Sequence, residues 1–311
     1  MLFRSVLVPT LSNPYYPMLV QSIEQAAAER GFHVLLCNTR RDEKTEQYYL
    51  NLLGQGCVRG IIYCFTPGLS VSASRQSSLP TVVIGEKDDR INLDTVGLHS
   101  FKAGVLVADH LISLGHHKMA FVSTPLQNMT LSRKLRLDGI RSRLQSHGLE
   151  TSLIIKAATS EQEQALQAFE LEAGYHLTRE LMQETDVTAI IAVNDITACG
   201  VLNALNSLGC QVPGQVSVCG LANIRLASAS YPGLTTIDHS IEQRAKTALD
   251  ILMEKAGKLD EQAKDQPNDR VYKIEYEPRL IVRVQPVRPL AAIMADTARF
   301  SKPCRLAPFQ P

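Results

Sequence analysis

The sequence predicts an α/β protein made of two similar lobes, each a parallel sheet flanked by helices, with the lobes joined by crossover segments. Short apolar runs alternate with longer amphipathic stretches along most of the chain, which is typical of parallel strands covered by helices on both faces. The order strand, loop, helix, glycine and strand is found at Ser5–Cys37 and again at Met119–Ile155. This repetition indicates that one architectural unit is used twice, and a length of 311 residues leaves room for two cores.

The first lobe opens with a strand predicted at Ser5–Pro9 and a helix that Asn13 caps and Pro14 begins. Asparagine is favoured at an N-cap and proline at the first helical position. The helix is expected to end at Gly31, because glycine readily adopts the left-handed conformation that closes a helix. Further strands are expected at 32–37, 58–63 and 81–84, and a further helix at 44–53.

The second lobe begins with a helix at 100–114, which Gly115 ends. The other elements expected in it are strands at 119–123, 153–155, 189–193 and 216–219, and helices at 131–147, 174–184 and 195–208. After residue 234 the pattern changes to segments too few for a third domain, which we interpret as chain crossing back between the lobes. They are strands at 234–237, 271–276 and 280–284 and a helix at 241–254.

These elements predict where the chain divides. The N-terminal lobe is assigned residues 1–98 and 239–270, and the C-terminal lobe residues 99–238 and 271–284. Residues 285–311 contain several prolines and no sustained periodicity. We expect them to form a poorly ordered tail.

Composition limits the classes of partner. The 32 Lys and Arg against 31 Asp and Glu leave a formal charge of +1, so the chain lacks the basic excess of a protein that holds DNA or a membrane through its whole body. Seven cysteines without a CxxC pair indicate buried reduced thiols rather than disulfides or zinc ligands. No signal peptide and no run of transmembrane length are recognisable. We expect a cytoplasmic protein.

Candidate ligand contacts lie where strands end, because parallel sheets bind ligands beyond the carboxyl ends of their strands. Tyr15 and Tyr16 offer flat rings to a sugar or base, although either could pack in the core. Arg136 is either a surface residue or a ligand contact whose planar guanidinium recognises hydroxyls, a carboxylate or a phosphate. Asn194 is the better ligand candidate of its pair, with Asp195 the expected N-cap.

Signals of catalysis are weak. The sequence contains no GxSxG elbow, P-loop or HExxH motif. We predict no catalytic residue, no metal and no cofactor. An enzyme on a similar scaffold remains the third alternative.

Several segments together carry a resemblance to a known family. They are SVLVPTLSNPYYPMLVQSIEQAAAERGFHVLLCNT, VRGIIY, HLISLGHHKMAFV, LRLDGI, AIIAVNDITACGVLNALNSLGCQVPGQVSVCG, LTTID and PRLIVR. In unbroken order from Ser5 to Arg283, they resemble the effector-binding core of LacI/GalR-family transcriptional regulators, a type I periplasmic-binding-protein-like fold.

The resemblance implies a core that senses a small-molecule effector, a sugar, sugar derivative or purine, between its lobes. It implies signalling by lobe closure, a homodimer, no contact with a membrane, and contact with DNA only through a helix-turn-helix head. Because the sequence begins at the first core strand, we expect this chain to lack that head. A transport-type periplasmic sugar-binding protein and a headless sensor that does not itself bind DNA are the alternatives.

By position, five residues match the family's ligand contacts: Ser12, Tyr15, Tyr16, Arg136 and Asn194. Two acidic positions of the family pattern are lost, since Gly85 and Ala222 stand where it commonly has aspartate. The adjacent Glu86 and Asn223 complete the predicted ligand-binding set. Because Arg136 is kept while two negative charges are missing, we hypothesise an anionic effector such as a sugar acid or phosphosugar.

Overall fold

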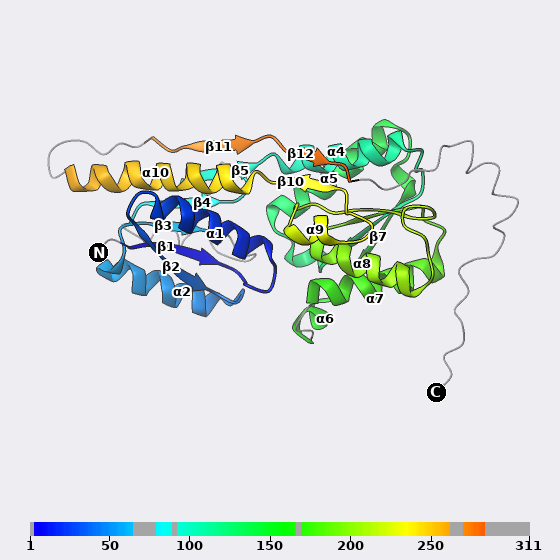
Figure 1. Ribbon diagram of the computed structural model, residues 1–311, viewed down its shortest axis with the longest axis horizontal. Helices are drawn as coiled ribbons and strands as arrows, with labels where there is room; N and C mark the ends of the chain where they lie inside the picture. Colours follow the sequence, from blue (N-terminus) through cyan, green and yellow to red (C-terminus); the bar gives the residue numbers. More distant parts are fainter. Residues whose placement is uncertain (1–2, 65–78, 89–91, 166–168, 262–269, 284–311) are drawn as a thin grey trace, which may run out of the picture. The chain divides into compact units, whose positions relative to one another are not determined.

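The computed structural model describes residues 3–64, 79–88, 92–165, 169–261 and 270–283. The chain divides into two compact units. Unit 1 contains residues 1–99, 130–132 and 239–278, and unit 2 contains residues 100–129, 133–238 and 279–311. Both units are α/β, as the sequence predicts (Figure 1). The predicted tail, 285–311, lies outside the described residues.

Unit 1 is built on a six-stranded sheet with the order β11-β5-β4-β3-β1-β2, in which every neighbouring pair is parallel. Its strands are β1 (Phe3–Val8), β2 (His33–Asn38), β3 (Ile61–Tyr63), β4 (Thr81–Ile84), β5 (Asp94–Leu98) and β11 (Lys273–Tyr276). Its helices are α1 (Tyr15–Ala28), α2 (Glu43–Leu52), the π-helix η1 (Leu53–Cys57) and α10 (Ile241–Glu261). Apolar residues of α1 and α10, such as Ile23 and Leu249, form one core with the sheet. Residues such as Leu53 form a second core with it.

One predicted assignment in this unit is wrong. The strand expected at 271–276 was placed in the second lobe, but β11 pairs with β5 in register Lys273↔Thr95, and unit 1 extends to Pro278. The strand β5 itself is absent from the predicted elements. Its segment, DTVGL, is fully buried yet begins with the polar pair Asp94 and Thr95. A short strand without a continuous apolar run gives no signal of the sheet that it joins.

The ends of α1 follow the sequence closely. The helix begins at Tyr15 rather than at Pro14, and the Asn13 side chain still accepts a hydrogen bond from the Tyr15 N–H, at 3.0 Å. After its last residue the chain turns through Gly31 at φ +74°, and the Phe32 N–H returns to the Ala27 carbonyl. This is the left-handed closure expected of a glycine after a helix.

Unit 2 has a four-stranded parallel sheet with the order β7-β6-β8-β9 and a separate antiparallel pair, β10 with β12. The strands are β6 (Met119–Ser123), β7 (Leu153–Ala157), β8 (Ala189–Ala192), β9 (Ser217–Cys219), β10 (Thr236–Asp238) and β12 (Arg279–Ile281). The helices are α4 (Ser100–Ser113), α5 (Leu131–Ser146), α6 (Ser160–Ala165), α7 (Phe169–Glu184), α8 (Asp195–Ser207) and α9 (Arg225–Ala229), with 3₁₀ turns η2 (Leu126–Asn128) and η3 (Glu150–Ser152). Neither α6 nor α9 is predicted from the sequence. The predicted start of α7, at Gly174, lies five residues after the observed start at Phe169.

Two glycines let helices of unit 2 approach each other closely. A Cβ on Gly174 of α7 would lie 2.2 Å from the carbonyl oxygen of Thr197 in α8. A Cβ on Gly104 of α4 would lie 2.0 Å from the carbonyl oxygen of Arg136 in α5. Both distances are far below van der Waals contact. The first turn of α8 and the Arg136 backbone are therefore held against their neighbouring helices.

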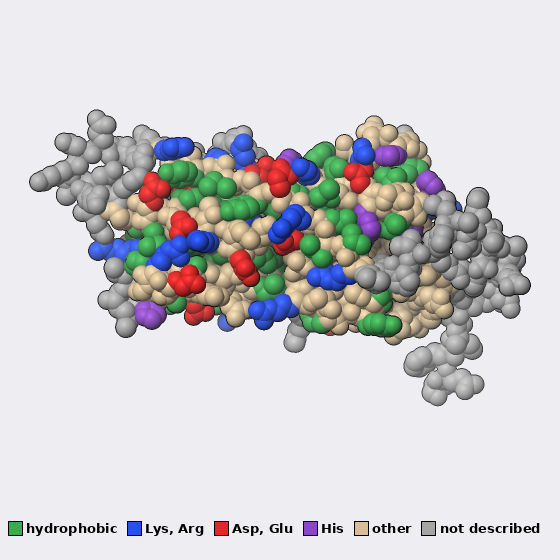
Figure 2. Space-filling view, turned by 45° about the horizontal axis from the view of Figure 1, so that its top comes forward, with side chains coloured by type: hydrophobic (Ala, Val, Ile, Leu, Met, Phe, Trp, Pro, Cys, Tyr) green, Lys and Arg blue, Asp and Glu red, His purple; other side chains and the backbone are tan. Residues whose placement is uncertain are grey.

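The surface and the thiols agree with the composition. On the face that Figure 2 draws, basic and acidic side chains are interspersed. Within the described residues, Cys37, Cys64, Cys199, Cys210 and Cys219 are reduced cysteines outside any disulfide, and all but Cys199 are buried, as predicted. Burial raises the pKa of Cys64 to about 12. In the described part of the chain, no helix has both the length and the apolar character needed to cross a membrane.

Candidate functional site

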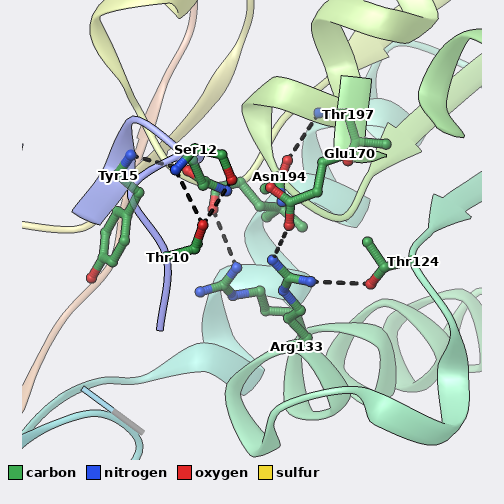
Figure 3. A network of polar contacts seen from close by, with 11 residues as sticks. Thr10, Ser12, Tyr15, Thr124, Arg133, Glu170, Asn194 and Thr197 are labelled. Carbon is green, nitrogen blue, oxygen red and sulfur yellow. Dashed lines mark hydrogen bonds and ion pairs between the residues drawn. The ribbon is translucent and has the colours of Figure 1, made fainter. Parts of the chain in front are cut away.

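The predicted site residues of unit 1 follow the carboxyl ends of two strands. Ser12, Tyr15 and Tyr16 come after β1, and Glu86 comes after β4. Ser12 is exposed, and its hydroxyl lies 2.7 Å from that of Thr10. The rings of Tyr15 and Tyr16 are half-buried and meet edge to face, with their centroids 5.3 Å apart. Figure 3 shows Thr10, Ser12 and Tyr15 at the start of α1.

Two buried residues beside Tyr15 were missed by the sequence analysis. Arg244, in the first turn of α10, donates through Nη1 to the Tyr15 hydroxyl at 3.1 Å and through Nη2 to the Val96 carbonyl at 3.2 Å. The His239 ring meets the Tyr15 ring edge to face, at 5.4 Å. Both residues are 4% exposed. Arg244 lies in the polar segment SIEQRAK, where an arginine is expected on the exposed face of an amphipathic helix. The burial of Arg244 therefore could not be inferred from the sequence.

Glu86 presents a carboxylate at the same edge of the sheet. Its side chain is half-buried, and its Oε2 atom is buried without a hydrogen-bond partner among the described residues. A buried polar atom without a partner is costly. The carboxylate is therefore placed to accept hydrogen bonds, as the hydroxyls of a sugar would supply.

Arg136 is a buried residue of unit 2, so the interpretation of it as a surface arginine is wrong. It is 8% exposed, and its Nη1 donates to the Leu221 carbonyl at 3.3 Å. Leu221 belongs to the loop that follows β9. The guanidinium therefore joins α5 to one of the strand-end loops.

The roles predicted for Asn194 and Asp195 need correction. Asn194, not Asp195, caps α8, because its Oδ1 accepts a hydrogen bond from the Thr197 N–H at 2.9 Å (Figure 3). Its Nδ2 amide is buried and has no hydrogen-bond partner among the described residues, and the residue is 5% exposed. One half of the side chain thus stabilises the helix. The other half is a donor that still needs an acceptor.

Asp195 instead organises the loop after β9. It is fully buried, and its Oδ1 accepts hydrogen bonds from the Ala222 N–H at 3.0 Å and the Thr236 hydroxyl at 2.6 Å. Its Oδ2 accepts from the Ile224 N–H at 2.9 Å. Burial raises the pKa of this carboxyl, and the hydrogen bonds act in the opposite direction. The carboxylate fixes the loop that presents the acceptor of Arg136.

Asn223 lies in that loop with a left-handed backbone, at φ +48°. Its N–H donates to the Thr236 hydroxyl at 3.1 Å, and its Oδ1 accepts from Arg283 Nη2 at 2.7 Å. Arg283, after β12, also donates to the Leu234 carbonyl at 2.8 Å. The carbonyl side of the Asn223 amide is therefore occupied, and a ligand would meet its Nδ2 group.

A further ion pair, which the sequence analysis missed, lies in the same unit. Arg133 contacts Glu170 at 2.6 Å and donates to the Thr124 hydroxyl at 3.0 Å (Figure 3). The two charged side chains are 16% and 7% exposed. The Arg133 guanidinium compensates the charge of the Glu170 carboxylate.

The polar groups of unit 2 therefore offer mainly donors at the strand ends. Arg136 and the Asn194 amide donate, whereas the carboxylates of Asp195 and Glu170 are held by protein groups. Such a surface suits a ligand rich in oxygen atoms. Among the described residues, no group of three or more His, Cys, Asp or Glu side chains is arranged to hold a metal ion.

Comparison with known proteins identifies the family. Residues 108–283 match the periplasmic binding protein-like domain. The chain is 33% identical over 248 residues to the HTH-type transcriptional regulator DegA of Bacillus subtilis, covering 77% of this chain and 69% of DegA. The chain belongs to the LacI family of transcriptional regulators.

Two other proteins support this assignment. The LacI-family chain is 30% identical over 252 residues to the ribose operon repressor of Escherichia coli, covering 80% of this chain and 73% of the repressor. A LacI-family regulator of Enterococcus faecium, solved with bound ribose, is 25% identical and has a TM-score of 0.76, covering 91% of this chain and 98% of that one. Both are named as regulators of transcription or repressors, and neither as an enzyme.

Proposed function

We propose that this chain is the effector-sensing core of a LacI-type transcriptional regulator and binds a sugar or sugar derivative at the strand ends of its two units. The observation that carries the proposal is the Asn194 amide at the start of α8, a buried donor for which the described residues supply no acceptor. Arg136, buried and bonded to the loop that Asp195 holds, supplies a second donor in the same unit. The ribose-bound Enterococcus faecium regulator makes sugars the first class of effector to test.

The proposed signal is a change in how the two units are arranged. The candidate effector contacts are found in unit 1, such as Tyr16 and Glu86, and in unit 2, such as Asn194 and Asn223. A ligand that binds one arrangement better than another shifts the population toward it. A coupling of about 1–3 kcal/mol is typical of allosteric proteins and would suffice. We propose that the protein acts in the cytoplasm and reaches DNA through a helix-turn-helix head.

A thermal-shift screen tests the proposal. The purified chain is mixed with sugars, sugar acids, phosphosugars and purines, since a ligand specific for the native state stabilises it by about 2.7 kcal/mol at 100 times its Kd. The best ligand is then titrated against Arg136→Ala, which should weaken binding at least tenfold. Arg141→Ala is the matched control, because Arg141 lies on the same helix, is 53% exposed and forms only a 3.8 Å ion pair with Asp138. Equal affinities of the wild type and Arg136→Ala would remove Arg136 from the site.

We also propose a homodimer. It is supported by β2, the edge strand of the unit 1 sheet, on which Leu35 and Leu36 are 41% and 39% exposed. An apolar edge strand is suited to pairing with a second copy. Sedimentation should give a dimer for the wild type and a monomer for Leu36→Lys, with Leu226→Lys, on the 45% exposed Leu226 of α9, remaining dimeric. A monomeric wild type at micromolar concentration would contradict the dimer.

A further inference from the structure

Arg244 is a buried cation of unit 1 whose hydrogen-bond acceptors are both neutral. The residue is 4% exposed, and its partners are the Tyr15 hydroxyl and the Val96 carbonyl. Its Nε atom is buried and has no hydrogen-bond partner among the described residues. Burying an unpaired guanidinium costs several kcal/mol unless a counter-charge or several acceptors compensate it.

No carboxylate compensates Arg244 within the described part of the chain. Arg133, by contrast, contacts the Glu170 carboxylate at 2.6 Å. Glu86, at the end of β4, forms no such contact with Arg244 in the described residues. Among the described residues, no carboxylate therefore neutralises the charge on Arg244.

The position of Arg244 places that group in the candidate site. The Val96 carbonyl, which accepts from Arg244, also accepts from the Gly85 N–H at 3.3 Å. Gly85 directly follows β4, and Glu86 is the next residue. Tyr15, the other acceptor of Arg244, is a predicted ligand contact. The cation of Arg244 thus lies beside the end of β4 and beside Tyr15.

We propose that Arg244 determines effector specificity by receiving a carboxylate or phosphate group of the effector. The inference rests on the proposed function and narrows it to anionic sugar derivatives. An anion accepts the free Nε–H of Arg244 and neutralises the buried charge, which a neutral hydroxyl cannot do. The hydroxyls of the same ligand remain available to Glu86. If Arg244 only joined α10 to α1 and β5, the protein would show no preference for anionic over neutral ligands.

The test compares matched ligands on the whole chain. Isothermal titration measures the affinities of ribose, ribonate and ribose 5-phosphate, and of glucose, gluconate and glucose 6-phosphate. The carboxylate and phosphate arms distinguish the two kinds of anion. The variants are Arg244→Gln, which removes the charge, and Arg244→Lys, which keeps it. Arg30→Gln is the control, because Arg30 is a cation of the same unit that pairs with Asp250 at 2.6 Å.

We expect one acid or phosphate to bind at least tenfold more tightly than its parent sugar. Arg244→Gln should reduce this ratio to about one, Arg244→Lys should restore part of it, and Arg30→Gln should leave it unchanged. An unchanged ratio in Arg244→Gln, or a wild type that prefers the neutral sugar, overturns this inference and leaves the proposed function standing. Because the wild-type ratio alone can overturn it, the test holds even if Arg244→Gln fails to fold. If no sugar or derivative binds, both proposals are rejected.

Discussion

Replacing Asp195 by asparagine tests how the loop after β9 is held. Asp195 is fully buried and accepts three hydrogen bonds, from Ala222, Ile224 and Thr236. Asparagine has nearly the same shape but offers one acceptor oxygen instead of two. Whichever way the amide turns, its NH₂ group faces at least one of these donors.

The expected loss of stability follows from that mismatch. A buried donor left without a partner costs about 1–3 kcal/mol, and bonds to a charged acceptor are stronger than those to an amide. Part of this loss is offset, because burial raises the pKa of Asp195 and the substitution removes a charge that burial disfavours. We expect Asp195→Asn to lower the free energy of unfolding by about 2 kcal/mol.

Urea unfolding at neutral pH, followed by circular dichroism, measures this difference. Asp186→Asn is the matched control, because Asp186 lies in the same unit in an ion pair with Lys118 that is exposed on both sides, at 77% and 60%. Exposed pairs of this kind contribute about 0–1 kcal/mol. Asp195→Asn should also weaken effector binding, since the loop presents the acceptor of Arg136. A variant as stable as Asp186→Asn would refute the role assigned to Asp195.

Three further substitutions test the packing and electrostatics of unit 2. Gly174→Ala should destabilise the protein by more than about 3 kcal/mol in urea, because its Cβ would lie 2.2 Å from a helix carbonyl; Gly54→Ala, with open space around it, should be neutral. Arg133→Met should cost roughly 2–3 kcal/mol by uncovering the buried Glu170 carboxylate, and adding Glu170→Gln should restore part of that loss. Burial lowers the pKa of His116 from 6.5 to about 4, so the unfolded chain binds more protons in that window and stability should fall as the pH drops from 6.5 to 4. The stability of His116→Gln should fall less steeply over this pH range than that of the wild type. Parallel pH profiles of the two proteins would contradict the lowered pKa of His116.

The fold was largely predictable because apolar periodicity and helix-ending glycines are local signals. The strand at Thr81–Ile84 and the strand at Met119–Ser123 have the predicted bounds. The missed elements are those without such signals. β5 is buried but begins with Asp94 and Thr95, and which sheet β11 joins depends on a pairing partner distant in the sequence.

The positions of the candidate site residues in the fold were predictable, but their hydrogen bonds were not. The sequence places Asn194 correctly at the start of α8. That Asn194 rather than Asp195 caps the helix could not be predicted, because Asp195 instead bonds to the loop after β9. The burial of Arg136 and Arg244 could not be read from their polar neighbourhoods in the sequence. Both depend on carbonyl acceptors in distant segments, Leu221 and Val96.

Hydrogen–deuterium exchange with and without the effector that gives the largest thermal shift tests the central claim most directly. If the strand ends of both units bind the effector, amide exchange should slow at residues 10–16, 131–137, 194–198 and 220–226, while the edge strand β2 exchanges as before. Slowed exchange confined to other segments, with all four of these ranges unchanged, would contradict an effector site built from Tyr15, Arg136 and Asn194.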